Sequence, residues 1–204
     1  MDDHDGRLRE LDLGAAWQQL NQRYRRYRTN GALRTDQPTQ VDTFGAWLTL
    51  TSPSPFGTWT YGADAWIDVV DSWDELAPGS PGEFGDDSTY QTLGLFVQNE
   101  LPLDEHVELI SALRYSYVDL EARQVAGYGD MRANWDTLSA SARVAWHVRR
   151  DSIFYIGVTQ GFRAPNLADC TRLGEYASGS FEAPAGELTE ERYLTYEVGA
   201  KSRG

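Results

Sequence analysis

Apolar and polar residues alternate with a period of two along most of the chain, as they do in β-strands that present two different faces. The clearest run is TLSASARVAWHV, residues 137–148, in which every even-numbered residue is apolar and most odd-numbered ones are polar. YQTLGLFVQNEL and EHVELISALRYSYV repeat the pattern. Together with noisier segments it predicts eight strands, several longer than the usual five or six residues, over residues 8–28, 41–51, 57–70, 90–101, 105–118, 137–148, 152–163 and 189–203.

The connections between these strands alternate in length. The long, polar connections span residues 29–40, 71–89, 120–134 and 164–188, and the short ones 52–56, 102–105 and 149–151. In an up-and-down sheet, long and short connections then fall at opposite ends. Outer-membrane barrels have this arrangement, with short periplasmic turns and longer external loops. A soluble sandwich has no reason to sort its loops in this way, so the alternation favours a membrane β-barrel.

The two faces of the predicted strands support this interpretation. Strands of about ten residues match a tilted span of the hydrocarbon layer, and aromatic residues gather near strand ends, as they do in interfacial girdles. Arg114 and Arg143 would need no buried partner if the polar face lines a wet lumen. That face also carries small residues such as Gly94 and Ser139, which predicts the wall of a wide barrel more than a closed eight-stranded one.

Composition narrows the range of functions. The formal net charge of −13 argues against nucleic-acid binding, which needs a basic surface. The basic and aromatic run RYRRYR (Arg23–Arg28) is interpreted as a solvated strand end. No run of roughly 18 apolar residues is present, so a helical membrane protein is not predicted. The opening MDDHDGRLRELDL lacks a signal-peptide pattern, so an exported protein is expected to have a longer precursor.

The sequence contains no recognisable catalytic motif, so neither an enzyme nor a bound cofactor is predicted. His4, His106 and His147 are far apart and have no metal-ligand spacing. The single cysteine, Cys170, allows no disulfide framework and no cysteine-based metal site within the chain. The acidic segment 71–89 lacks the fixed ligand spacing of a calcium loop and is interpreted as solvated.

Two motifs near the end of the chain resemble the barrel of TonB-dependent outer-membrane receptors. GFRAPN closes a predicted strand, and GELTEERYLTYEVGAKS follows after a loop, as in that family. Thr189 stands where the family has a proline, and the resemblance covers roughly residues 57–204. The matching residues are Gly161, Phe162, Arg163, Pro165, Asn166, Leu188, Glu190, Tyr196, Glu197, Gly199 and Lys201.

The resemblance implies an all-β, antiparallel up-and-down transmembrane barrel of about 22 strands with a plugged lumen. Residues 1–204 would form an incomplete segment of about eight long strands, without the plug domain and the remaining strands. The implied function is import of a scarce nutrient, such as an iron–siderophore complex or cobalamin, across the outer membrane. The implied partners are outer-membrane lipid, the TonB complex and a small-molecule ligand.

The resemblance gives the motif residues a structural role. Phe162 is expected in the outer aromatic girdle, and Arg163 is expected to reach lipid phosphates or a loop carboxylate. Pro165 is expected to end the strand ladder, where its missing N–H is harmless.

Two alternatives stay open at this point. One is a small stand-alone outer-membrane barrel with an adhesive or structural role, which flanking sequence without a plug would favour. The other is a soluble β-sandwich binding module, which a monodisperse monomer without detergent would favour.

Overall fold

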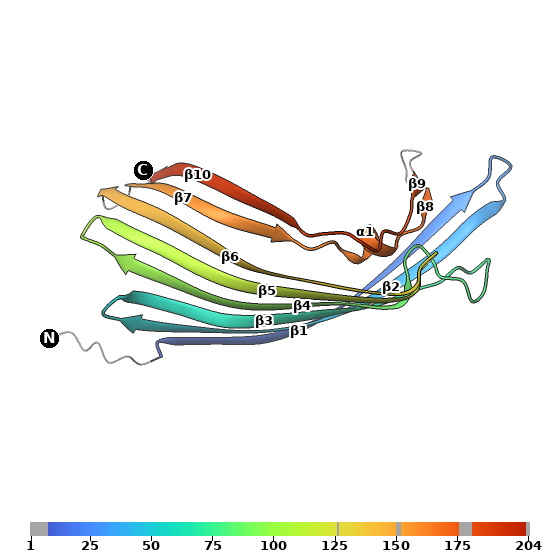
Figure 1. Ribbon diagram of the computed structural model, residues 1–204, viewed down its shortest axis with the longest axis horizontal. Helices are drawn as coiled ribbons and strands as arrows, with labels where there is room; N and C mark the ends of the chain where they lie inside the picture. The colour runs from blue at the N-terminus through green and yellow to red at the C-terminus, as the bar shows by residue number, and fades with distance from the viewer. Residues whose placement is uncertain (1–7, 126, 150–151, 176–180, 203–204) are drawn as a thin grey trace.

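The computed structural model describes residues 8–125, 127–149, 152–175 and 181–202. Within them the chain forms one curved, eight-stranded antiparallel sheet whose strands follow one another in sequence order (Figure 1). Its strands are β1 (Glu10–Tyr27), β2 (Leu33–Ser54), β3 (Gly57–Ser72), β4 (Asp86–Pro102), β5 (Val107–Val125), β6 (Gly129–Arg149), β7 (Ser152–Arg163) and β10 (Glu191–Ser202). The sheet is open, with β1 and β10 as its edges. The predicted all-β, up-and-down architecture is therefore confirmed.

The connection between β7 and β10 contains the remaining elements. These are the helix α1 (Leu167–Thr171) and the paired two-residue strands β8 (Gly174–Glu175) and β9 (Phe181–Glu182). Among the described residues, no helix is long and apolar enough to cross a bilayer.

Two of the predicted long connections are mostly strand. The predicted loop 29–40 is wrong because β2 begins at Leu33 and pairs with β1 from there. The predicted loop 120–134 is wrong because β5 continues and β6 already begins at Gly129. The start of β2 is mostly polar, whereas the end of β5 and the start of β6 do alternate but place their apolar residues, such as Leu120 and Met131, on the face opposite to the apolar face of the rest of each strand.

The two ends of the sheet nevertheless differ as predicted. The irregular connections 73–85 and 164–190 lie at one end, called here the loop end, together with the tips of the β1–β2 and β5–β6 hairpins (Figure 1). The turns 55–56 and 103–106 lie at the opposite end, called the turn end, where β1 begins and β10 ends.

One face of the sheet, called here the outer face, is apolar across its whole width. Each of the eight strands places an exposed large apolar residue on it: Leu13, Phe44, Ile67, Leu95, Leu113, Val144, Ile156 and Val198. Continuous apolar surface of this extent is unusual on a soluble monomer and marks a contact with lipid or protein. The alternation predicted for residues 137–148 is confirmed, because Leu138, Val144 and Trp146 all lie exposed on this face.

The opposite, inner face is flat because large side chains lie over glycines of the adjacent strand. A Cβ at Gly14 would come within 2.1 Å of Trp47, and one at Gly199 within 2.4 Å of Tyr155. The same contact recurs across the sheet, with Trp66 over Gly45, Phe96 over Gly62, Arg114 over Gly94 and Tyr193 over Gly161. The indoles of Trp47 and Trp66 stack, with ring centroids 6.2 Å apart and planes 12° apart.

Charged residues on the inner face pair across strands. Arg114 Nη2 lies 2.8 Å from Asp64 Oδ2, with 42% of the arginine side chain exposed. Arg143 pairs with Glu197 through an Nε–Oε1 hydrogen bond of 2.7 Å, and its guanidinium lies 5.2 Å from the ring centroid of Tyr155. These arginines are thus partly solvated and partly paired, as the wet inner face requires.

Val144→Arg should destabilise the protein strongly if the outer face lies in a bilayer. Val144 sits near the middle of the apolar run of β6, where an arginine costs about 2–4 kcal/mol in barrels of this type. Val144→Leu should be tolerated, and Thr159→Arg on the inner face serves as the control. Denaturant titration in lipid vesicles measures the difference, and equal stabilities for the two arginine variants would show that this face is not in lipid.

Gly199→Ala should lower stability by about 1–3 kcal/mol, because the added Cβ would collide with the Tyr155 ring. Removing the ring in Gly199→Ala/Tyr155→Ala should make the glycine substitution nearly neutral relative to Tyr155→Ala alone. A double-mutant cycle from unfolding free energies checks this, and strictly additive effects would contradict the contact.

Candidate functional site at the loop end

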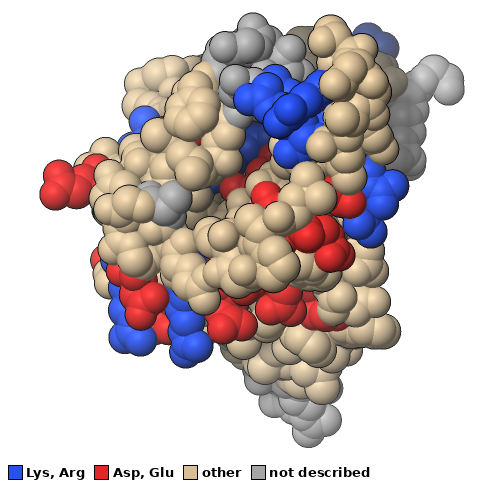
Figure 2. Space-filling view, turned by 90° about the vertical axis from the view of Figure 1, so that its right-hand side faces the viewer, with Lys and Arg blue, Asp and Glu red and all other residues tan. Residues whose placement is uncertain are grey.

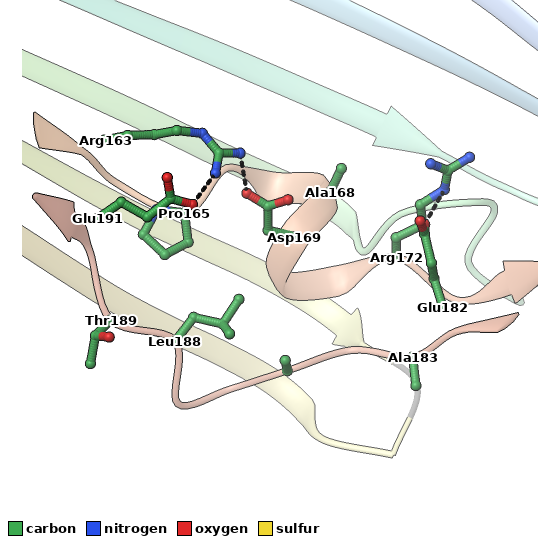
Figure 3. A pocket seen from close by; sticks show the side chains of 11 residues that line it. Arg163, Pro165, Ala168, Asp169, Arg172, Glu182, Ala183, Leu188, Thr189 and Glu191 are labelled. Atoms are coloured by element: carbon green, nitrogen blue, oxygen red, sulfur yellow. Dashed lines mark hydrogen bonds and ion pairs between the residues drawn. The ribbon is translucent and has the colours of Figure 1, made fainter. Parts of the chain in front are cut away.

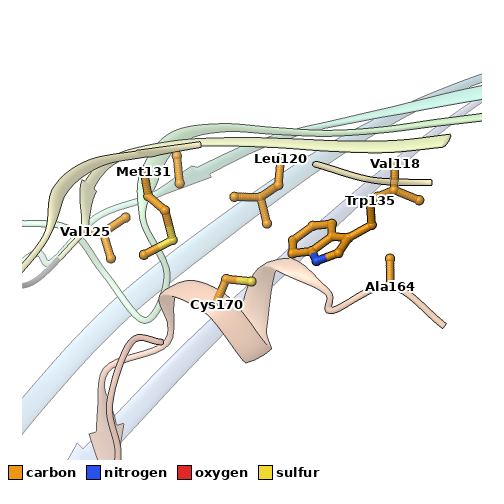
Figure 4. Packing of buried hydrophobic residues seen from close by; sticks show 8 residues of the cluster. Val118, Leu120, Val125, Met131, Trp135, Ala164 and Cys170 are labelled. Carbon is orange, nitrogen blue, oxygen red and sulfur yellow. The ribbon is translucent and has the colours of Figure 1, made fainter. Parts of the chain in front are cut away.

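A buried apolar cluster joins the connection 164–190 to the sheet (Figure 4). The sheet contributes Val118, Leu120, Ala122, Val125, Met131 and Trp135, and the connection contributes Ala164 and Cys170. Leu188 packs against the cluster, and its carbonyl accepts a hydrogen bond of 3.0 Å from Trp135 Nε1. The connection therefore folds back onto the inner face instead of extending into solvent.

The GFRAPN motif begins this return. Asn166 caps α1, accepting a hydrogen bond from Asp169 N at 2.8 Å, while the Asp169 carboxylate accepts one from Asn166 N at 3.1 Å. This reciprocal capping box satisfies two backbone donors of a helix that is only five residues long. The strand ladder ends at Arg163, two residues before Pro165, whose carbonyl accepts a hydrogen bond of 3.2 Å from the Tyr90 hydroxyl.

Arg163 connects three elements through two ion pairs. Its Nη2 lies 2.8 Å from Asp169 Oδ2 on α1, and its Nη1 lies 2.7 Å from Glu191 Oε1 at the start of β10. The arginine itself ends β7, so one side chain fixes the helix against both strands. Its partners are loop-end carboxylates.

The expected position of Phe162 in the outer girdle is wrong. Phe162 is partly buried and packs against the inner cluster. The β6–β7 ladder ends at Ser141–Thr159, so the last residues of β7 are free to turn away from β6. Sequence alternation alone would have kept Phe162 on the outer face, because it carries no information on where a ladder ends.

The second motif does not form one site. Leu188 lies in the cluster, and Glu190 accepts a hydrogen bond of 3.0 Å from Arg192 Nε, so both belong to the loop end. The others lie along β10 towards the turn end: Tyr196 exposed on the outer face, Glu197 paired with Arg143, Gly199 under Tyr155, and Lys201 exposed. The structure thus brings together the GFRAPN residues with Leu188 and Glu190 only.

A contact between the two long connections was not found from the sequence. Arg172, just after α1, pairs with Glu83 of the connection 73–85 and lies 3.2 Å through Nε from Glu182 Oε2 of β9. Two backbone groups add to it: Gly85 N donates to Thr171 Oγ1, and Leu173 N donates to the Glu83 carbonyl, each at 3.3 Å. Glu83 is one of several acidic residues in its connection, and nothing in the sequence separates it from the others.

A cavity of about 430 Å³ lies between α1 and residues 182–191 (Figure 3). Its size lies within the range of small-molecule sites. Two arginines and three carboxylates line it beside the apolar Pro165 and Leu188: Arg163, Arg172, Asp169, Glu182 and Glu191. Figure 2, which views the molecule from the loop end, shows acidic and basic side chains in mixed groups there. The cavity suits a polar ligand that presents both hydrogen-bonding and apolar groups.

Two other groups of titratable residues lie elsewhere. The acidic segment brings carboxylate oxygens of Asp71, Asp86 and Asp87 within 4.8 Å of one another. At the turn end, His106 and His147 are neighbours despite their distance in sequence, since His147 N donates to the His106 carbonyl at 2.7 Å. Their proximity was not visible in the sequence spacing, because it depends on the pairing of β5 with β6.

Comparisons with known proteins give a consistent result. Residues 2–204 match the family model described as TonB dependent receptor-like, beta-barrel. A search of curated proteins finds no match.

Several solved structures share the fold. The copper transporter OprC aligns with a TM-score of 0.73 and 15% identity, over 98% of this chain and 34% of that one. A double mutant of the Serratia marcescens hemophore receptor HasR, in complex with its hemophore HasA and heme, aligns with 0.71 and 18%, over 98% and 34%. The ferric yersiniabactin uptake receptor FyuA from Yersinia pestis aligns with 0.60 and 17%, over 95% and 31%. The chain thus spans about a third of the length of these structures.

Arg163→Gln should increase the reactivity of Cys170 by loosening α1. Burial of Cys170, together with the smaller effect of the neighbouring Asp169 carboxylate, raises the pKa of its thiol to about 11. Since the thiolate is the reactive form, labelling by iodoacetamide at pH 8 should be slow in the wild type and several-fold faster in the variant. Mass spectrometry measures the rate. Arg192→Gln is the control, and equal rates in all three proteins would show that Arg163 does not hold the helix.

Proposed function

Because the chain belongs to the TonB-dependent receptor-like β-barrel family, we propose that it is part of an outer-membrane receptor that imports a scarce nutrient. In this proposal the loop end faces the exterior and the turn end faces the periplasm, which is the usual distribution of long and short connections in such barrels. Energy comes from the TonB complex through a plug domain that lies outside residues 1–204. No enzymatic activity is proposed.

The continuous apolar outer face is the observation that carries the proposal. A soluble β-sandwich would bury one face of each sheet against another layer, whereas here every strand exposes a large apolar residue on the same side. The opposite face carries paired, partly exposed charges among aromatic rings, which suits a barrel with a wet or plugged lumen. This separation of faces favours a membrane barrel over the soluble alternative.

The open sheet argues against a small stand-alone barrel. β1 and β10 do not pair with each other, although eight strands are enough to close a small barrel. The inner face is also flat, with aromatic rings lying over glycines of adjacent strands, whereas a small closed barrel fills its interior with side chains. Both features support a wall segment of the wide barrel that is usual for this family.

The cargo is proposed to be a metal-bearing nutrient, an iron chelate being the leading class. The similar structures are a copper transporter, a hemophore receptor in complex with its hemophore and heme, and a ferric yersiniabactin uptake receptor. The cavity beside α1 faces the inner side of the loop end, and its mixed charges suit part of a polar chelate. Its residues are therefore the proposed cargo contacts in this segment.

Deleting the coding region for this chain should abolish growth on one scarce nutrient. Iron-chelate, heme and copper sources are each supplied alone at limiting concentration, and uptake of the labelled nutrient is measured. The loss should be equal to that in a strain without TonB, and a wild-type copy should restore uptake while Val144→Arg should not. A chain that fractionates with soluble proteins, or unchanged uptake of every nutrient, would overturn the proposal.

A further inference from the structure

The first hairpin extends beyond the rest of the sheet at the loop end. β1 and β2 pair up to Tyr27–Leu33, whereas β2 pairs with β3 only from Thr39 onwards (Figure 1). Residues 23–38 therefore form a two-stranded projection, called here the basic hairpin. The connection 73–85 supports its base, since Glu75 N donates to the Asp36 carbonyl at 3.0 Å.

The basic hairpin is positively charged within an acidic protein. It carries five arginines and one acidic residue, a net charge of +4, whereas the whole chain has −13. The charged residues are Arg23, Arg25, Arg26, Arg28, Arg34 and Asp36. A local excess of this size attracts an anionic partner even though the protein as a whole repels one.

Two of the arginines are held side by side by one buried carboxylate. Arg23 forms a fork on Asp36, with Nε–Oδ1 and Nη2–Oδ2 distances of 2.5 and 2.7 Å, and Arg25 Nε lies 3.2 Å from the same Oδ1. The Asp36 side chain is 7% exposed, while those of Arg23 and Arg25 are 44% and 47% exposed. The carboxylate thus orders two guanidinium groups that stay nearly half exposed, with Arg23 Nη2 also 3.9 Å from Glu75 Oε1 of the connection 73–85. Planar guanidinium groups favour phosphate.

The register directs this pair away from the inner face. Arg23 and Arg25 are odd-numbered residues of β1, and so are Leu13 and Trp17, which lie exposed on the apolar outer face. A cargo that enters through the inner side of the loop end would approach the opposite face. The partner is therefore on the membrane side.

The distance of Arg23 and Arg25 from the apolar part of the outer face indicates which kind of lipid headgroup they could reach. From Trp17 to Arg23 the strand advances about 20 Å, or about 15 Å along the membrane normal at the usual barrel tilt. Phospholipid headgroups add only about 5–8 Å to each side of the hydrocarbon layer. Phosphates at the height of Arg23 require a taller headgroup, such as a phosphorylated oligosaccharide.

We propose that the basic hairpin binds phosphate groups on the sugar headgroup of lipopolysaccharide in the outer leaflet, with Arg23 and Arg25 as the phosphate ligands. The inference rests on the outer-membrane placement proposed above. It gives the RYRRYR run a role beyond that of a solvated strand end. The hairpin would anchor the rim of the barrel to the glycolipid layer around it.

The test compares binding of phosphorylated lipopolysaccharide to the intact receptor in detergent micelles. Each arginine near a charged lipid surface contributes about fivefold in affinity, so Arg23→Gln/Arg25→Gln should bind roughly 25-fold more weakly. Arg132→Gln/Arg192→Gln removes the same charge from exposed arginines of β6 and β10 and should stay within about twofold of wild type. Dephosphorylated lipopolysaccharide and phosphatidylglycerol should show no such difference between the variants.

Several outcomes would overturn the inference. Equal affinity of wild type and Arg23→Gln/Arg25→Gln for phosphorylated lipopolysaccharide would do so, as would an equal loss for phosphatidylglycerol or in the control variant. Unchanged lipid binding with impaired nutrient uptake would assign the arginines to the cargo instead. Failure of the membrane placement itself is distinguished by fractionation, because the wild-type protein would then be absent from the outer membrane.

Discussion

Every backbone N–H and C=O group of the membrane-facing strands must be paired with a group of a neighbouring strand. Inside a bilayer no water can complete an unpaired N–H or C=O group, so each strand depends on two paired neighbours. This requirement explains the continuous register from β1 to β10 and the strict alternation along each strand. It also makes the outer edges of β1 and β10 the positions where this segment needs further strands, as proposed for the wide barrel.

The inner face has a different constraint, because its side chains must leave room for whatever occupies the lumen of the proposed barrel. Glycines accept the rings of Trp47, Trp66 and Tyr155 from the adjacent strands, so bulky residues lie flat along the wall. At the loop end, α1 covers Leu120 and Trp135 on this face. The proposed cargo cavity adjoins this covered patch, so its walls rest on packed apolar residues while its charged groups stay near solvent.

The fold was largely predictable from the sequence because a strand with one apolar and one polar face shows up as a direct alternation of apolar and polar residues. The run 137–148 shows this directly, and so does the order of the connections. The extended hairpins were not predicted, since residues 33–40 are mostly polar and in residues 118–135 the apolar residues change to the inner face, as at Leu120 and Met131. For the site, GFRAPN was found as a motif, but the partners of Arg163 and the contact between Glu83 and Arg172 depend on three-dimensional folding of distant loops.

The GFRAPN motif begins just after the point at which β7 stops pairing with β6. Beyond Thr159, β7 no longer pairs with β6, and the Ala140 N–H is satisfied by Gln160 Oε1 at 3.0 Å in place of a backbone carbonyl. This substitution frees the chain to turn inwards and bury Ala164 in the cluster. A backbone group unpaired in lipid would cost several kcal/mol, and Ala140 lies between the exposed outer-face residues Leu138 and Val144, so the hydrogen bond to Gln160 is needed where the ladder opens. The motif therefore follows directly on the point where β7 stops pairing with β6, and the proposed cargo cavity lies beside it, with Arg163 and Pro165 in its lining.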